Sequence, residues 1–253
     1  MAYWVEPKYV WRYGRPLARD DIRTADEATP RIQHYIRRAF KRYTERSGKP
    51  RFMEKTPSNC FRVPFVHAVL PNARFLHIIR DGRDVARSAV KKWTTPPDPA
   101  AIRRRFKSFE IPLLDIPFYV VDMLREVVGR QFFPERALVW GPRFPEIRKV
   151  RAEEGVEAAC ATQWQESVRS ALEGLVVVPP NQQMTVQFED LVRDPTPNLI
   201  SILEFLSLSL SDDVLDYASE IIERTAASRW RNDGIDATFE LRLQPLLSEL
   251  GYN

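Results

Sequence analysis

Short apolar runs and longer amphipathic segments follow one another along the chain, a pattern that is typical of strands alternating with helices. Residues 75–79 read Phe-Leu-His-Ile-Ile, a nearly continuous apolar run, as expected of a parallel strand that is covered on both faces. Residues 83–92 then carry apolar side chains at helical spacing. Residues 51–54 and 184–188 are further candidate strands. The pattern therefore predicts an α/β fold.

Capping residues and prolines mark where the helices begin and end. Thr29-Pro30 offers an N-cap and a first-turn proline, and Gly48 is placed to end the helix that comes next. Ser58 is placed to cap another helix, in which Pro64 falls near the first turn, where proline is tolerated. The predicted helices cover residues 30–48, 58–70, 83–92, 117–131, 153–173, 199–206, 214–222 and 239–250.

The first 15 residues are rich in aromatic side chains and contain Glu6-Pro7, which breaks any helix. We expect an extended or looped segment whose rings pack on the core or, alternatively, lie near a substrate cleft. His67 and His77 each lie among apolar residues. Both are predicted to be hydrogen-bonded core histidines and not catalysts.

The prolines of residues 94–99 mark a boundary within the chain. Beyond it we predict a helical insertion over residues 99–175, which is the expected acceptor-side region. Its aromatic and proline-rich stretch, residues 132–145, is a candidate lining for an acceptor site. The length suits one α/β domain, so residues 1–253 are interpreted as a single domain.

Composition narrows the class of protein. With 44% hydrophobic residues the chain can build a core, and no apolar run approaches the roughly 20 residues that span a bilayer. The first residues lack a secretory-signal pattern, so we expect a cytoplasmic protein. The formal charge of +4 is small, and no basic stripe with stacking aromatics predicts nucleic-acid binding. Cys60 and Cys160 lack metal-ligand spacing and are expected to be free thiols.

A candidate anion site lies at the end of the most apolar of the predicted strands. Arg80 stands where that strand should end, and Asp81-Gly82 makes the turn into a helix. A helix start offers unpaired N–H groups and a partial positive charge, and arginine adds a planar fork of donors matched to phosphate oxygens. Alternatively, Arg80 and Arg83 pair with Asp81 and Asp84 on a solvated helix start.

Two stretches of the sequence carry a resemblance to a known family. Residues 54–57 read Glu-Lys-Thr-Pro, and residues 78–88 read Ile-Ile-Arg-Asp-Gly-Arg-Asp-Val-Ala-Arg-Ser. They resemble the sulfotransferases that use 3′-phosphoadenosine 5′-phosphosulfate (PAPS). In that family an arginine and a serine eight positions apart hold the 3′-phosphate of the nucleotide, and they fall here on Arg80 and Ser88. The resemblance implies a P-loop-NTPase-like parallel sheet flanked by helices, a helical C-terminal part, and PAPS as co-substrate without a metal.

The resemblance continues later in the chain. Residues 188–191 read Phe-Glu-Asp-Leu, similar to the family's Tyr-Glu-Asp-Leu, so the Phe188 ring is expected near the nucleotide without a phenolic hydrogen bond. Residues 228–232 resemble the basic loop that closes over the nucleotide, which assigns Arg229 and Arg231 to nucleotide binding. The acceptor implied is a small molecule or carbohydrate with a hydroxyl or amine. The oligomeric state stays open, with a homodimer as one option.

Sulfuryl transfer needs positioning, cations near the leaving oxygen and a base for the acceptor proton. Where the cytosolic branch of the family has Lys-Thr-His, this chain has proline after Lys55-Thr56, so that histidine is absent. The carbohydrate-modifying branch has a similar Glu-Lys-Thr-Pro in which the glutamate is the base. The resemblance therefore implies Glu54 as base and Lys55 as the cation at the transferring group. The alternative is an ordinary surface pair between Glu54 and a neighbouring lysine or arginine.

One feature of the family is missing from the sequence, a glycine-rich loop after the first strand that cradles the 5′-phosphosulfate. Residues 5–11 resemble a segment that family members carry downstream of that loop. We expect a truncated chain that lacks a central strand and half of the nucleotide site. The alternative is a natural variant that binds the nucleotide poorly or serves as a non-catalytic partner. A nucleotide kinase is disfavoured because no Gly-x-x-x-x-Gly-Lys-Ser/Thr sequence is present.

Overall fold

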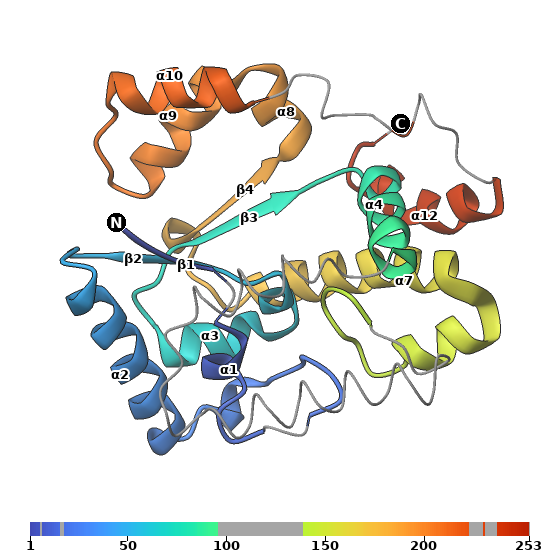
Figure 1. The fold of residues 1–253 in the computed structure, drawn as a ribbon, viewed down its shortest axis with the longest axis horizontal. Helices are drawn as coiled ribbons and strands as arrows, with labels where there is room; N and C mark the ends of the chain where they lie inside the picture. The colour runs from blue at the N-terminus through green and yellow to red at the C-terminus, as the bar shows by residue number, and fades with distance from the viewer. Residues whose placement is uncertain (6, 16–17, 96–138, 223–229, 231–236, 253) are drawn as a thin grey trace.

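The structure is a computed structural model that describes residues 1–5, 7–15, 18–95, 139–222, 230 and 237–252 (Figure 1). Within these ranges helices alternate with parallel strands, so the predicted α/β fold is confirmed. The predicted insertion is described only from residue 139 onward, and the helix predicted within its first half lies outside the described residues.

The described strands form two parallel pairs. β1 (Ala2–Val5) pairs with β2 (Phe52–Lys55), and β3 (Phe75–Ile79) pairs with β4 (Gln183–Gln187). The last three agree within one residue with the predicted strands. β1 lies in the stretch that was predicted only as extended or looped. Four residues without clear alternation give little strand signal, and their pairing depends on a segment far along the chain.

The helices are named in Figure 1 and have the following bounds: α1 Lys8–Trp11, η1 Ala25–Glu27, α2 Pro30–Arg46, η2 Pro57–Arg62, α3 Val63–Val69, α4 Gly82–Thr94, α7 Ile147–Leu175, η5 Pro180–Gln182, α8 Phe188–Arg193, α9 Pro195–Phe205, α10 Asp212–Ile221 and α12 Ala237–Glu249.

One helix prediction is wrong in detail. Residues 58–70 do not form a single helix, because the 3₁₀ segment η2 comes first and α3 starts only at Val63. Pro64 explains the break, since it has no N–H to donate to the turn before it. With the start moved to Val63, Pro64 occupies the first turn of α3, where that donor is not needed.

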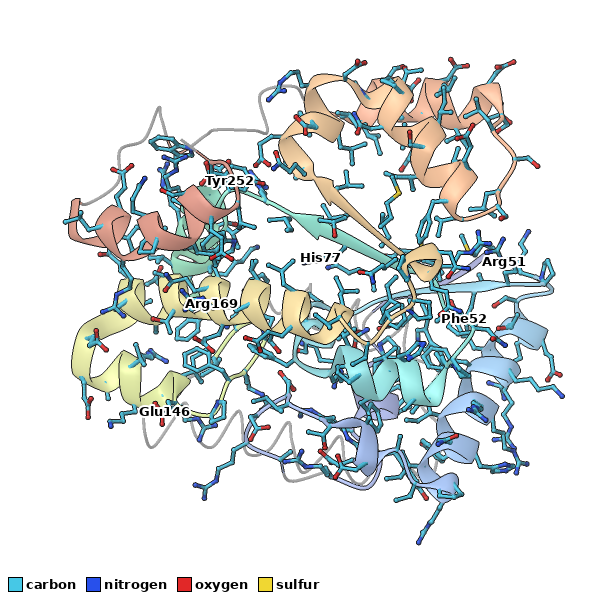
Figure 2. The ribbon with its side chains drawn as sticks, turned by 180° about the vertical axis from the view of Figure 1, so that it is seen from behind. Arg51, Phe52, His77, Glu146, Arg169 and Tyr252 are labelled. Atoms are coloured by element: carbon cyan, nitrogen blue, oxygen red, sulfur yellow. The ribbon has the colours of Figure 1, made fainter. Side chains whose placement is uncertain are left out.

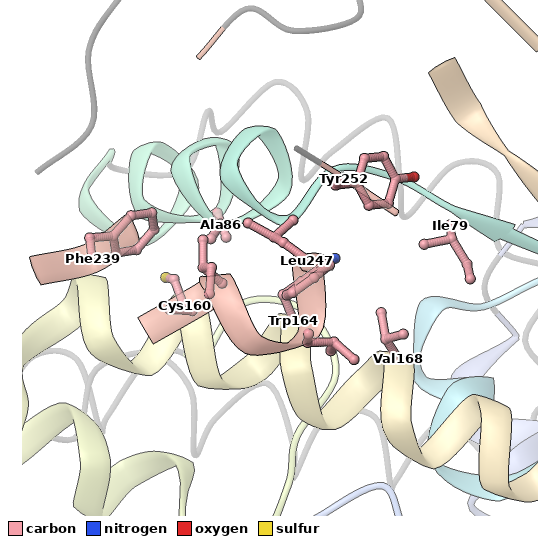
Figure 3. Packing of buried hydrophobic residues seen from close by; sticks show 12 residues of the cluster. Ile79, Ala86, Cys160, Trp164, Val168, Phe239, Leu247 and Tyr252 are labelled. Atoms are coloured by element: carbon pink, nitrogen blue, oxygen red, sulfur yellow. The ribbon is translucent and has the colours of Figure 1, made fainter. Parts of the chain in front are cut away.

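The long helix α7 packs against α4 and α12 (Figure 1). Cys160 and Trp164 of α7 meet Ala86 of α4 and Leu247 of α12 in one buried cluster (Figure 3). Gly82, the first residue of α4, lies directly on the Trp164 ring, and a Cβ there would stand 2.7 Å from it. The approach of α4 to α7 therefore requires glycine at this position.

A second buried cluster lies where α1, α2 and α3 pack beside β1 and β2. The Phe40 and Phe52 rings stack with their centroids 4.4 Å apart, and Trp4 stacks on Tyr43 at the same distance. Trp11 is 1% exposed at the centre of the cluster. Trp4, Tyr9 and Trp11 therefore pack on the core, as the first of the two expectations states, whereas Tyr3 is exposed.

The helices α8, α9 and α10 come after β4 and lie on the opposite side of the strands from α7 (Figure 1). Two arginines from the strand region hold the turn that ends α9. Arg51 donates from Nη2 to the Leu206 carbonyl at 2.8 Å, and Arg74 donates to the Phe205 carbonyl and to Ser207 Oγ. These bonds fix the α8–α10 layer to the starts of β2 and β3.

Among the described residues, β2 and β3 each pair with a single strand, so each keeps one edge outside the two ladders. Apolar side chains on both strands face solvent, since Met53 is 42% exposed and Ile78 is 48% exposed. Parallel strands are usually buried on both faces, so this exposure is unusual.

His77 lies midway along β3 (Figure 2). Burial lowers the pKa of its imidazole, and its Nδ1 is buried without a hydrogen-bond partner. The prediction of a hydrogen-bonded histidine is therefore wrong for this nitrogen. The main-chain groups around a side chain midway along a paired strand already bond to one another in the ladder, so they offer this nitrogen no partner.

Candidate functional site

The first turn of α4 is shaped by a buried ion pair. The Asp81 carboxylate caps the helix, accepting a hydrogen bond from the Arg83 N–H at 2.8 Å and another from Arg83 Nη2 at 2.8 Å. The side chains of Arg83 and Asp81 are only 4% and 5% exposed. This pair belongs to the turn itself and fixes the direction in which α4 leaves β3.

Arg80 stands at the carboxyl end of β3, as predicted. Its Nη2 donates to Asp84 Oδ2 at 3.1 Å, and its Cζ lies 4.5 Å from the centroid of the Phe188 ring, in reach of a cation–π interaction. The alternative prediction of arginine–aspartate pairs is right about the partners but wrong about solvation, because the Asp84 side chain is 1% exposed. The Arg80 side chain remains 30% exposed, so part of it faces solvent.

The late basic loop reaches the same helix start through Trp230. The Trp230 N–H donates to Asp84 Oδ1 at 2.9 Å, and the Arg83 Cζ lies 3.8 Å from the centroid of its ring. Its two predicted nucleotide-binding neighbours, Arg229 and Arg231, lie outside the described residues. The described residue between them nevertheless brings this part of the chain to the first turn of α4.

Sequence reasoning missed two residues behind this turn. Glu189 of α8 accepts a hydrogen bond from the Asp81 N–H at 3.0 Å and another from the Tyr252 hydroxyl at 2.8 Å. Tyr252 lies beyond the end of β3 in Figure 2, and burial together with the Glu189 charge raises the pKa of its phenol. For Glu189, the signal in the sequence was the resemblance of residues 188–191 to the family.

Ser88 lies two turns into α4, on an exposed part of the helix. The binding of one phosphate by Arg80 and Ser88 together stays a prediction.

Glu54, the predicted base, lies near the carboxyl end of β2 with its carboxylate mostly buried. Thr56 Oγ1 donates to its Oε1, and Asn59 Nδ2 donates to its Oε2 at 2.6 Å. Burial raises the pKa of Glu54, and the neighbours Thr56, Trp11, Arg62 and Asn59 partly offset that rise. A raised pKa suits a group that must accept a proton near neutral pH.

The surface-pair alternative for Glu54 does not describe this geometry. Both carboxylate oxygens accept hydrogen bonds from side chains just beyond β2 in the sequence, Thr56 and Asn59. Lys55, the next residue along β2, is exposed, and adjacent strand residues point to opposite faces. Its role near a transferring group stays a prediction.

Both cysteines are free thiols, and burial raises the pKa of Cys60 and of Cys160 to about 12. Over the described ranges, no group of histidine, cysteine, aspartate and glutamate side chains is arranged to hold a metal ion. None of the described helices combines the length and apolar character that a membrane span requires.

Comparison with known proteins assigns the chain to a family. The family model described as "Sulfotransferase family" matches residues 11–138 and 119–212. In fold the chain is similar to the sulfotransferase domain from the curacin biosynthetic pathway, with a TM-score of 0.55 and 15% identity over 86% of this chain and 68% of that one. The sulfotransferase domain from the Synechococcus PCC 7002 olefin synthase gives a TM-score of 0.49 and 17% identity over 88% and 68%. No curated protein matches the sequence.

Proposed function

Because the chain belongs to the sulfotransferase family, we propose that it transfers a sulfuryl group from PAPS to a hydroxyl or amine of a small-molecule or carbohydrate acceptor. In this proposal Arg80 and Ser88 hold the 3′-phosphate, and Phe188, Arg229 and Arg231 complete the nucleotide site.

The observation that carries the proposal is the surroundings of Arg80. A partly exposed guanidinium stands at the first turn of α4, where helix N–H groups favour an anion. Phe188 packs against it from α8, and Trp230 brings the basic loop to the same turn. In the proposal the exposed part of the Arg80 guanidinium, whose Nη2 also bonds Asp84, donates to the phosphate, and the two aromatic side chains are suited to lie beside a nucleotide.

The catalytic step is assigned to β2. PAPS supplies the sulfuryl group and a phosphate as leaving group. Glu54 accepts the proton of the acceptor O–H or N–H while that atom bonds to sulfur and the bond from sulfur to the phosphate oxygen breaks. Lys55, whose side chain leaves β2 on the other face, is assigned by the family resemblance alone to supply positive charge for the leaving oxygen.

The test is binding of adenosine 3′,5′-bisphosphate, followed as a rise in melting temperature with nucleotide concentration. Arg80→Ala should weaken binding roughly 10- to 100-fold, since a hydrogen bond to a charged group is lost. Arg148→Ala is the matched control, because Arg148 is exposed on α7. Binding that is absent in the wild type, or unchanged in Arg80→Ala, contradicts the proposal.

A second candidate function is nucleotide binding without transfer. It is favoured by the division of the described strands into two separate pairs. Labelled PAPS and a panel of hydroxyl, amine and carbohydrate acceptors distinguish the two. Transfer of label excludes the second function, whereas binding of the bisphosphate without any transfer favours it.

A further inference from the structure

The Glu54 carboxylate is bonded to buried or half-buried polar side chains that have no part in the proposed mechanism. Asn59 is one of them, and its amide bonds on both sides. Nδ2 donates to Glu54 Oε2 at 2.6 Å, while Oδ1 accepts from Arg62 Nε at 2.9 Å. A carboxylate only accepts and a guanidinium only donates, so only this orientation of the amide satisfies both neighbours. Asn59 therefore bonds to both charged groups at once.

Arg62 is a cation with almost no access to water, since the whole residue is 1% exposed. Burial lowers its pKa to about 10, although the carboxylates of Asp21 and Glu54 act in the opposite direction. At neutral pH its charge is therefore retained. A buried charge of this kind is costly unless anions face it, and here Glu54 is one of the two.

Asp21 acts on Arg62 through its negative charge and has hydrogen-bond partners of its own. Ser58 Oγ donates to its Oδ2 at 2.9 Å, and the Arg143 N–H donates to the same oxygen at 2.9 Å. The Arg12 guanidinium donates to Oδ1 at 3.1 Å. The segment before α7, which contains Arg143, is thus bonded to Asp21, whose charge acts on Arg62.

We propose that Asn59 and Arg62 are positioning residues for Glu54: the amide fixes the direction of the carboxylate, and the cation stabilises its ionised form. This inference rests on the proposed role of Glu54 as base. The negative charge of Asp21 favours the cationic form of Arg62. The groups with charge or a titration that face the pair are Asp21, Arg12 and the Cys60 thiol.

The physical reason is that burial and a nearby cation have opposite effects on the protonation of a buried base. Removal from water favours the neutral acid, which could not accept a proton. A cation one amide away favours the carboxylate, and hydrogen bonds in a chain polarise one another. Thr56 and Asn59 also occupy one position on each carboxylate oxygen, which leaves the remaining lone pairs in a fixed direction. The base is then oriented before an acceptor arrives.

The decisive variant is Asn59→Asp, which keeps the size of the side chain and its bond with Arg62 but faces Glu54 with a second carboxylate. The titration of Glu54 is followed by carboxyl ¹³C NMR, with Glu54→Gln to assign the signal. We expect the pKa of Glu54 to rise by roughly one unit or more. Asn181→Asp, on the exposed segment η5, is the matched control and should leave that titration unchanged.

Two further measurements test the inference even if the Asn59→Asp variant does not fold. In the wild type, the side-chain amide protons of Asn59 should shift with the same midpoint as the Glu54 carboxyl. Arg62→Lys keeps the charge but loses the planar Nε donor, and should raise the pKa of Glu54 by less than Asn59→Asp does. An Asn59 amide that does not follow Glu54, or a Glu54 titration unchanged in folded Asn59→Asp, overturns the inference.

The failure of the proposed function has a different signature. If Glu54 is the base, the pH midpoint of kcat/KM moves upward in Asn59→Asp together with the NMR titration. A loss of packing alone would not move that midpoint. If the NMR titration moves and the kinetic midpoint does not, the positioning of Glu54 stands while its role as base falls.

Discussion

The Glu54 carboxylate shows how a residue suited to chemistry can weaken the fold that holds it. Burial raises its pKa, so the folded protein binds the proton more tightly than the unfolded chain does. The free energy of unfolding therefore decreases as pH rises from the ordinary carboxyl pKa through the raised value, and it stays lower above that window. Below the ordinary pKa both states are protonated and this penalty is absent.

Glu54→Gln should accordingly have opposite effects on activity and stability. Sulfuryl transfer should fall by roughly 10²- to 10⁴-fold, the usual contribution of a general base. The melting temperature should rise at neutral pH and approach that of the wild type at pH values below the ordinary carboxyl pKa. Thermal unfolding at several pH values measures this difference. Glu146→Gln, an exposed carboxylate before α7 (Figure 2), is the control, and an equal gain there would contradict the explanation.

At this scale the sequence identified Arg80, Glu54 and Phe188, because each lies inside a contiguous motif. Asn59 and Arg62 lie only a few residues from Glu54, yet nothing in their spacing distinguishes them from surface residues. Their role appears only when η2 folds back under β2. Glu189 and Tyr252 were missed for a related reason, since their contact joins two segments that are far apart in the chain.

Among the elements, the contact between α4 and α7 sets the direction of the candidate nucleotide site. Trp164 packs on Gly82, and its Nε1 donates to the Arg80 carbonyl at 3.1 Å. One side chain of α7 thus supports both the first turn of α4 and the end of β3. Periodicity predicted both helices, but it contains no information on which residue of one meets which residue of the other.

Gly82→Ala tests this contact. A methyl group 2.7 Å from the Trp164 ring forces α4 away from α7, and overpacking of this kind costs about 1–3 kcal/mol. The melting temperature should fall by about 2–4 °C for each kcal/mol in a protein of this size. Lys92→Ala, on the exposed side of α4, should have little effect.

The double variant Gly82→Ala with Trp164→Leu separates a clash from a loss of backbone freedom. If the clash is the cause, the two substitutions together cost less than the sum of each alone. Additive effects would show that Gly82 matters for another reason.

The elements that the sequence predicted least well are those whose form depends on other elements. β1 exists because β2 is there to pair with it, and α3 begins late because Pro64 excludes an earlier start. The helices with a clear apolar face, such as α2, α4 and α10, were predicted close to their observed bounds. Local pattern was sufficient wherever one face of a single element carried the information.

For the whole molecule, the two strand pairs come with separate buried clusters. Trp11 belongs to the cluster beside β1 and β2, and Trp164 to the cluster beyond β3, between α4, α7 and α12. Described contacts between the two regions run mainly through α7, η2 and α3 and through the arginine bonds to the turn after α9. No ladder joins β2 to β3 among the described residues.

This division bears on cooperativity. A continuous sheet transmits the loss of one strand to all others, whereas two unconnected ladders can melt in sequence. In urea, single-tryptophan versions that retain Trp11 or Trp164 should therefore report different transition midpoints by fluorescence. Coincident curves would show that the contacts between the two regions couple them into one cooperative unit. With separate midpoints, the chain would spend part of its time half-folded under mild stress, with one ladder intact and the other open.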